Sequence, residues 1–345
     1  MENDYRVFNF LNKDSNDLIS KMNKQDLDEF LTLLNNYYLE YRTNLGINNN
    51  YTFGSEIETE YVDFENLILN MNNLYFDKEW DRKKEVSLIQ GIEINSPILK
   101  DYDEDWEELK SICDALKKCS TIGNNSGGHI HIGAHILEGN NDYWANMLKL
   151  WSAYEKIIYR FTNGEYTNSR KRILSFAKPI GHSLIKKIKY LEKIKNIDYV
   201  CQMFDNDRNN ALNLLNVGPS FYYYGNTIEV RCPNGTLEET IIQNNINFLI
   251  KFMEFSKSSE YDPLYINSLA KKSNKKAVQL ELYDEIYLDE SIKLADMIFD
   301  NNLDKIYFLR QYLKNFEVNP TTYYKDPPFS FTAKSVPKAK TFIKK

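Results

Sequence analysis

The chain has 345 residues, of which 42% are hydrophobic and 27% are charged, and it contains 25 Tyr and 19 Phe. This composition excludes a disordered chain and indicates a folded protein with a sizeable core. The formal net charge of −6 argues against nucleic acid as the main partner, because phosphate binding normally needs a basic surface.

The cysteines and the N-terminal sequence bear on the location of the protein. The four cysteines form no CxxC pair and are few for this length, so we expect reduced thiols, as in a cytosolic protein. The N-terminus is acidic and polar, unlike a signal peptide, and no stretch approaches about 18 uninterrupted apolar residues. We therefore expect a cytoplasmic protein with no membrane partner.

The first part of the chain has the pattern of a helical pair. From about Asp14 to Leu45, apolar residues recur at helical spacing between Asp and Lys. The next residues, 46–50, end in three consecutive Asn and have little to bury, so they are expected to form a loop. Residues 1–50 are thus predicted to be an N-terminal helical extension.

The middle of the chain mixes short strand-like runs with longer amphipathic ones. This mixture predicts an α+β domain over residues 51–258. Its helices are expected around Trp106–Leu116, Trp144–Ile158 and Ile241–Ile250.

The last part of the chain again has helical patterns, over Ala277–Asp300 and Leu303–Lys314. Residues 259–318 are therefore predicted to be C-terminal helices. The remaining residues, 319–345, are rich in Pro and Lys and are expected to form an extended tail.

Four strand-like segments of the middle domain place ionisable residues at alternate positions, with aliphatic residues between most of them. The segments are FGSEIETE, GIEIN, GGHIHIG and TIEVRC. Because a strand has a period of two, the two sets point to opposite faces. A single ExE pattern is usually a solvated surface, but four such segments together indicate one shared site. Its face would carry Glu56, Glu58, Glu60, Glu93, His129, His131, Glu229 and Arg231.

Carboxylates clustered in one cleft demand a cation or raised pKa values, because neighbouring negative charges disfavour each other's ionisation. Carboxylates with one or two imidazoles suit Mg²⁺ or Mn²⁺ better than a structural zinc site, which prefers Cys and His. Arg231, two residues beyond Glu229 on the same face, has a planar guanidinium suited to a phosphate or a carboxylate. Metals with an arginine are typical of phosphoryl transfer.

These segments resemble motifs of the glutamine-synthetase-like superfamily of carboxylate–amine ligases. FGSEIETE is similar to the FGxExE strand, NNSGGHIHIG to the glycine-led HxH strand and TIEVRCPNGT to the ExR strand, in the same order. GIEINSP takes the place of an intervening metal-binding glutamate. Within the superfamily, the sequence most resembles the amidoligase family, over roughly residues 51–255. The resemblance implies that the α+β domain is catalytic and has a curved, mainly antiparallel sheet packed on helices.

The resemblance also implies a role for each charged residue. Glu58 and Glu93 would help to hold one divalent metal ion, Mg²⁺ or Mn²⁺. The second metal ion would be held by Glu56, His129 and Glu229.

The remaining site residues are assigned to ATP by the same resemblance. His131 and Arg231 would face the phosphates, and together with Glu229 they are the expected catalytic group. Arg208 and Asn213 match a family segment in which an arginine precedes LN, and they are expected to help bind ATP.

The implied reaction has two steps. The substrate carboxylate attacks the γ-phosphate of ATP to give an acyl phosphate, and an amine then displaces phosphate to form an amide. Phosphorylation supplies the leaving group that a carboxylate lacks. The partners would be a carboxylate and an amine, each either free or part of a peptide or protein; no counterpart of the ammonium-binding flap of glutamine synthetases is recognisable.

Three other functions are compatible with the same residues. One is a metallohydrolase, another a phosphotransferase that stops after phosphoryl transfer, and the third a non-catalytic nucleotide-binding protein. The third is disfavoured because six charged groups in one cleft are costly to keep without catalysis. The sequence has neither a GxxxxGK[ST] loop nor a GxSxG motif.

Overall fold

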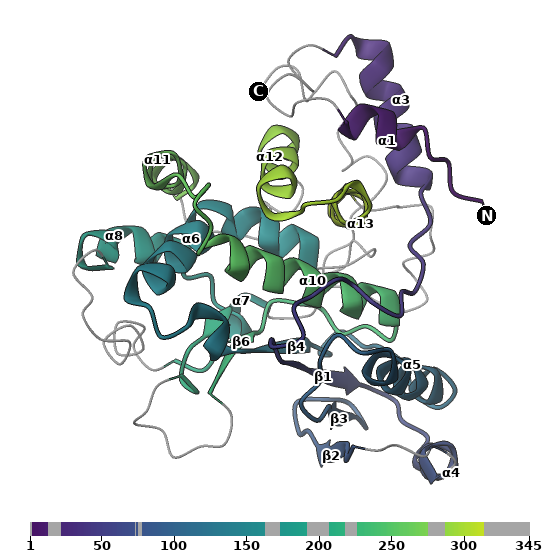
Figure 1. The fold of residues 1–345 in the computed structure, drawn as a ribbon. Helices are drawn as coiled ribbons and strands as arrows, with labels where there is room; N and C mark the ends of the chain where they lie inside the picture. The colour runs from purple at the N-terminus through teal and green to yellow at the C-terminus, as the bar shows by residue number, and fades with distance from the viewer. Residues whose placement is uncertain are drawn as a thin grey trace.

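The computed structural model describes residues 2–12, 22–72, 74, 78–162, 173–191, 207–217, 226–274 and 287–313 (Figure 1). These residues form a six-stranded sheet with the order β2-β3-β1-β4-β6-β5, in which every neighbouring pair is antiparallel. The strands are β1 (Phe53–Thr59), β2 (Asp81–Lys84), β3 (Ile92–Asn95), β4 (Gly128–Gly133), β5 (Leu212–Asn213) and β6 (Thr227–Val230).

Helices pack against this sheet, and the α+β class with an antiparallel sheet is confirmed. The helices α5, α6 and α10 lie where the sequence predicts them. The helices are α1 (Val7–Leu11), α3 (Lys24–Asn36), α4 (Phe64–Asn72), α5 (Asp103–Lys117), the 3₁₀ helix η1 (Ala134–Leu137), α6 (Asn141–Thr162), α7 (Ile173–Phe176), α8 (Gly181–Leu191), α10 (Glu239–Phe255), α11 (Pro263–Ser273), α12 (Leu288–Ile298) and α13 (Asn302–Leu313).

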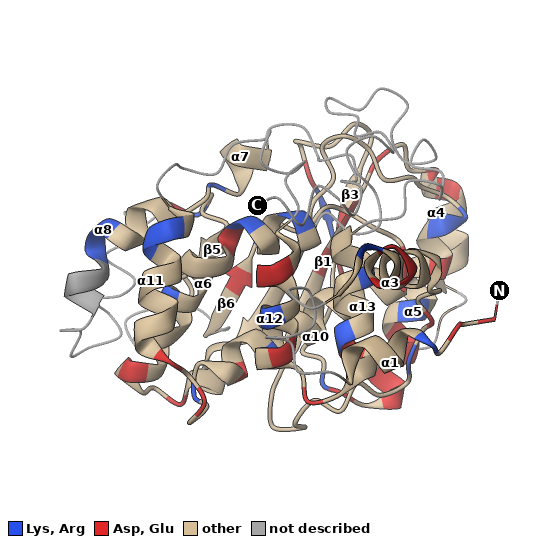
Figure 2. Cartoon of the chain, turned by 90° about the horizontal axis from the view of Figure 1, so that it is seen from above, with Lys and Arg blue, Asp and Glu red and all other residues tan. Residues whose placement is uncertain are grey.

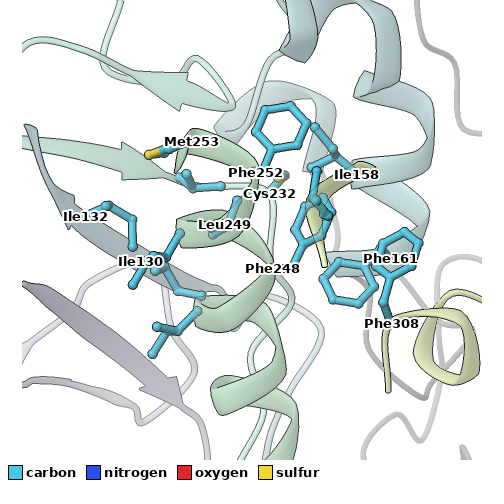
Figure 3. Packing of buried hydrophobic residues seen from close by; sticks show 14 of the residues in the cluster. Ile130, Ile132, Ile158, Phe161, Cys232, Phe248, Leu249, Phe252, Met253 and Phe308 are labelled. Carbon is cyan, nitrogen blue, oxygen red and sulfur yellow. The ribbon is translucent and has the colours of Figure 1, made fainter. Parts of the chain in front are cut away.

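One face of the sheet is aliphatic and packs on α10 and α5. In Figure 3, Ile130 and Ile132 of β4 lie beside Leu249 of α10, and all three are at most 2% exposed. At the same face, Phe53 of β1 stacks on Trp106 of α5 with ring centroids 4.9 Å apart. Because α10 has apolar residues on several sides, it is buried between the sheet and the outer helices.

Beyond α10, aromatic side chains join three helices. The ring of Phe248 on α10 lies 4.7 Å from that of Phe161 on α6 and 5.1 Å from that of Phe308 on α13 (Figure 3). Figure 1 shows α6, α12 and α13 on the side of α10 that is away from the sheet. The sheet therefore has a thick helical layer behind its aliphatic face.

The N-terminal helices pack against α13. The guanidinium of Arg310 donates from Nε to the carbonyl oxygen of Tyr37 at 2.9 Å, and Arg42 pairs with Asp304 at 2.6 Å. Both extensions belong to the same hydrophobic cluster as the sheet. The domain boundaries at residues 50, 258 and 318 stay predictions, and the predicted tail 319–345 lies outside the described residues.

The predicted N-terminal helical segment, 14–45, is too long. Helix α3 ends at Asn36, and Tyr37 is extended, with ψ 128°. After it, buried Tyr37 and Leu39 alternate with exposed Tyr38 and Glu40, which is the period of an extended chain. The apolar spacing that suggested a helix thus continues in an extended segment that packs on the C-terminal helices.

Charge is mixed over the helices. In the view of Figure 2, Lys and Arg are interspersed with Asp and Glu instead of gathering on one side. Within the part of the chain that the structure describes, no helix is long and apolar enough to cross a membrane.

Candidate functional site

The second face of the sheet carries the ionisable residues that the alternating pattern predicts. In the register of the strands, Glu56 of β1 is opposite His129 of β4, and His131 is opposite Glu229 of β6. Side chains that are opposite in neighbouring strands point to the same face. The antiparallel pairing thus brings together residues separated by as many as 173 positions, the interval from Glu56 to Glu229.

The start of β4 is fixed by a close approach of two backbone segments. A Cβ atom on Gly128 would lie 2.7 Å from the carbonyl oxygen of Asn234, so only glycine fits there. The Gly128 amide donates to the carbonyl oxygen of Pro233 at 3.1 Å. This contact sets the register in which His129 and His131 meet their neighbours.

Glu56 is the shared carboxylate of the site. Its Oε2 lies 2.5 Å from Nδ1 of His129, and its Oε1 lies 2.9 Å from Nε2 of His131. Burial acts to raise the pKa of Glu56, but hydrogen bonds from the two imidazoles outweigh it, so its pKa lies well below the ordinary value. Burial acts to lower the pKa of His131, but its hydrogen bond to Glu56 and the nearby negative charges raise it overall.

Glu229 is held from three sides. Oε2 accepts a hydrogen bond from Nδ2 of Asn213 at 2.6 Å, and Oε1 contacts a guanidinium nitrogen of Arg231. Nδ1 of His129 lies 3.7 Å from the same Oε1. Glu229 is only 5% exposed, so these contacts fix a buried carboxylate.

Glu56, His131 and Glu229 each offer a ligand atom, and these atoms lie within 4.8 Å of one another. Two carboxylates and an imidazole are a suitable donor set for Mg²⁺ or Mn²⁺. The family resemblance implies phosphate for His131 and this metal for His129, whereas both imidazoles lie against Glu56 in the structure.

Glu58 and Glu93 lie opposite each other in the neighbouring row of the same face. Oε2 of Glu58 accepts a hydrogen bond from the Gly127 amide at 2.5 Å. The pKa of Glu93 is raised, first by burial and then by the charges of Glu56 and Glu58. A cation beside Glu93 would relieve this repulsion.

Asn95 is a member of the site that the sequence analysis missed. Its Nδ2 donates to Oε1 of Glu93 at 2.9 Å, while its Oδ1 is buried and accepts no hydrogen bond from the described part of the chain. An orphaned buried oxygen beside carboxylates fits a cation-binding face. The only signal in the sequence is its position, two residues after Glu93 in the same strand, and an amide there has no distinctive pattern.

The remaining predicted residues differ in position. Asn213 joins the site through Glu229. Arg208 is exposed in the turn before β5 and makes no hydrogen bond or ion pair with the described members of the cluster. Glu60, predicted on the same face, is buried at the end of β1, where its Oε1 accepts from the Ile89 amide and from Asn125. It orders the loop before β4 instead of joining the cluster.

Comparison with known proteins identifies the family. The model of a family described as "Putative amidoligase enzyme" matches residues 69–253, which is more than half of the chain. The match includes β3, β4 and β6 but begins after β1, so the sheet alone brings Glu56 and Glu58 to the site.

Among solved structures, one described as the crystal structure of a novel glutamine synthase homolog is similar, with 9% sequence identity and a TM-score of 0.41. That similarity covers 76% of this chain and 65% of the other. No curated protein matches the chain.

Proposed function

The chain belongs to the amidoligase family, and from this membership we propose that it is an ATP-dependent ligase that activates a carboxylate as an acyl phosphate and joins it to an amine. The family itself supports an amide-forming ligase. The use of ATP, the acyl phosphate and two divalent cations, Mg²⁺ or Mn²⁺, is our proposal.

The charged face offers residues for both cations. Glu56, His131 and Glu229 would hold one of them, and Glu58 with Glu93 would hold the second. Bound there, a divalent cation supplies positive charge that neutralises the phosphates of ATP and the transferred phosphoryl group.

Arg231 is the residue that we assign to the phosphoryl oxygens. Its guanidinium contacts Glu229 and also donates from Nε to the carbonyl oxygen of Phe176 at 3.2 Å. These two contacts orient the planar guanidinium before substrate binds. An oriented guanidinium stabilises developing negative charge without the cost of reorganisation.

The chemistry consists of two displacements. In the first, an oxygen of the carboxylate bonds to the γ-phosphorus while the bond to ADP breaks. In the second, the amine nitrogen attacks the carbonyl carbon, phosphate leaves with its bonding electrons, and the nitrogen loses a proton. His129 and Glu229 are at most 5% exposed, and exclusion of water from this part of the site would protect the acyl phosphate.

The observation that carries the proposal is the convergence of Glu56, His131 and Glu229 within 4.8 Å, with Arg231 bound to Glu229. Three strands contribute these groups, and each group depends on the alternation of its own strand. Burial of so many ionisable side chains destabilises a fold, so their retention favours chemistry over a solvated surface.

The test uses the full chain with ATP, Mg²⁺, a pool of carboxylates and hydroxylamine. Hydroxylamine traps an acyl phosphate as a hydroxamate, so we expect ADP, phosphate and hydroxamate in equal amounts. The matched control is Glu56→Gln, which keeps the shape of the side chain and removes its charge. It is expected to abolish all three products.

Other outcomes identify the alternatives. ADP and a stable phosphorylated product without hydroxamate would indicate a phosphotransferase. Substrate turnover that needs metal but no nucleotide would indicate a metallohydrolase. Nucleotide binding without turnover of any carboxylate in the pool would favour a non-catalytic nucleotide-binding protein.

A further inference from the structure

Asn95 is the last residue of β3 and lies on the charged face. It is opposite Glu56 of β1 and Asp81 of β2 in the strand register and two residues from Glu93 in its own strand. Because side chains two apart in a strand share a face, its amide stands beside two carboxylates.

The orientation of the Asn95 amide follows from its hydrogen bond. Nδ2 lies 2.9 Å from Oε1 of Glu93, and the flipped amide would place its oxygen against the carboxylate oxygen. Oδ1 therefore points elsewhere, and there it is buried without a hydrogen-bond partner among the residues that the structure describes. A buried acceptor of this kind destabilises the protein unless a donor or a cation reaches it.

Asn213 provides a comparison within the same site. Its Nδ2 donates to Glu229 at 2.6 Å, and its Oδ1 accepts from the Leu215 amide at 3.0 Å. Both ends of this amide are occupied, so Asn213 is a positioning residue for Glu229. Asn95 has the same kind of contact at its nitrogen but a vacant acceptor at its oxygen.

We propose that Asn95 is a metal ligand, and that its amide oxygen binds the divalent cation beside Glu93. The inference rests on the cation site of the proposed function and extends it by one ligand that nothing in the sequence pattern marks. Hard cations accept amide oxygens readily. A neutral ligand also completes the coordination without adding charge to a face that already holds Glu56, Glu58 and Glu93.

The test is Mn²⁺ binding to the full chain without nucleotide, measured by calorimetry and by electron paramagnetic resonance. Asn95→Leu removes both the amide oxygen and the amide nitrogen and keeps the branched skeleton of the side chain. We expect at least a tenfold weaker affinity for one Mn²⁺, because loss of a ligand exceeds the effect of an outer-shell change. The melting temperature without metal should change little, because loss of the orphaned oxygen offsets loss of the donor to Glu93. By contrast, Asn213→Leu should lower it, since Glu229 and the Leu215 amide lose a partner.

A double-mutant cycle separates a ligand from a positioning residue. In a Glu93→Gln background, Asn95→Leu should weaken Mn²⁺ binding further if the oxygen is itself a ligand. If it has no further effect there, Asn95 acts only through Glu93 and the proposal is overturned. Asn95→Asp, which keeps an oxygen at this position, is a second variant and should retain Mn²⁺ affinity; loss of binding would contradict the proposal.

The two proposals fail in different ways. If the unaltered chain binds no Mn²⁺ at all, the cation site of the proposed function is wrong and the ligand falls with it. If it binds Mn²⁺ and Asn95→Leu binds it equally well, only the assignment of Asn95 is wrong.

Discussion

The two faces of the sheet differ in how far they are buried and by what means, because the charged face is partly open, with the side chains of Glu56 and His131 21–22% exposed. On one face, Ile57, Ile94 and Ile130 are at most 2% exposed because helices cover them. On the other, Glu58, His129 and Glu229 are 3–6% exposed, and their contacts are with other polar groups of the site. The first face stabilises the fold through apolar burial, whereas the second requires hydrogen bonds to offset the cost of burying charge. Stability and chemistry are therefore assigned to opposite sides of the same strands.

The largest expected effect is on activity, from Glu56→Gln. This carboxylate contacts both imidazoles, and its loss should lower kcat/KM on the order of 10³-fold, which corresponds to about 4 kcal/mol of transition-state stabilisation. Steady-state hydroxamate assays measure kcat/KM, and thermal unfolding measures the stability of the variant. A large fall in melting temperature with activity retained would break the division between the faces.

The opposite result is expected for Ile130→Ala, on the aliphatic side of β4. Removal of a fully buried side chain should lower the free energy of unfolding by about 2–4 kcal/mol. The activity per folded molecule should change little. Denaturant unfolding gives the first value and an active-site-normalised assay at low temperature the second; an unchanged stability would contradict the packing described above.

A buried carboxylate on α6, outside the charged face of the sheet, sharpens the comparison. Glu155 of α6 accepts hydrogen bonds from Trp151 and from the Ile180 and Gly181 amides, yet burial dominates and raises its pKa to about 7. Its unfolded value is near 4.5, so the folded state holds the proton more tightly. The stability from this group is fully present below about pH 4.5 and is lost as the pH rises to about 7.

We therefore expect Glu155→Gln to flatten part of the pH dependence of unfolding. Between pH 5 and pH 8, the unaltered chain should lose about 1–3 kcal/mol more than the variant. Urea unfolding at both pH values measures the difference. Parallel pH curves for the two proteins would show that Glu155 stays ionised in its three hydrogen bonds.

The smallest effect is expected at Lys83, which is opposite Glu93 but on the edge strand β2. Its ion pair with Asp81, at 3.5 Å, is more than half exposed on both sides. Lys83→Ala should change the free energy of unfolding by less than about 0.5 kcal/mol. A larger change by urea unfolding would mean that the edge strand contributes more to the charged face than its exposure indicates.

The sequence predicts the four strands of the site because isoleucines and valine alternate there with ionisable residues. It gives no signal for β2, whose four residues are all exposed, or for β5, which has two residues. A strand without an apolar face shows no alternation of apolar and polar residues, which is the signal by which a strand is predicted. The helical prediction of 37–45 fails because apolar spacing alone does not tell a helix from an extended chain that packs on other helices.

The candidate site, like the fold, could be predicted from the sequence only in part. Side-chain type and alternation predict that Glu56, His129, His131 and Glu229 share a face, but which atoms meet depends on the strand register, a long-range property. Asn95 and Asn213 show what the sequence does not reveal about the site. Both are asparagines on strands, and only their hydrogen bonds distinguish a vacant oxygen from an occupied one.

Because His and Ile alternate in β4, the proposed activity depends on the correct register of β4 with its neighbouring strands. If β4 slipped by one residue against its neighbours, Ile130 and Ile132 would turn to the charged face. His129 and His131 would then point into the apolar core beneath α10. Such a misfolded species would lose the packing of the aliphatic face and the proposed metal ligands in the same event. Under the proposed function, a variant whose β4 slips in register in some molecules would therefore be a mixture of active and inactive chains, unlike Glu56→Gln, which would weaken every chain equally.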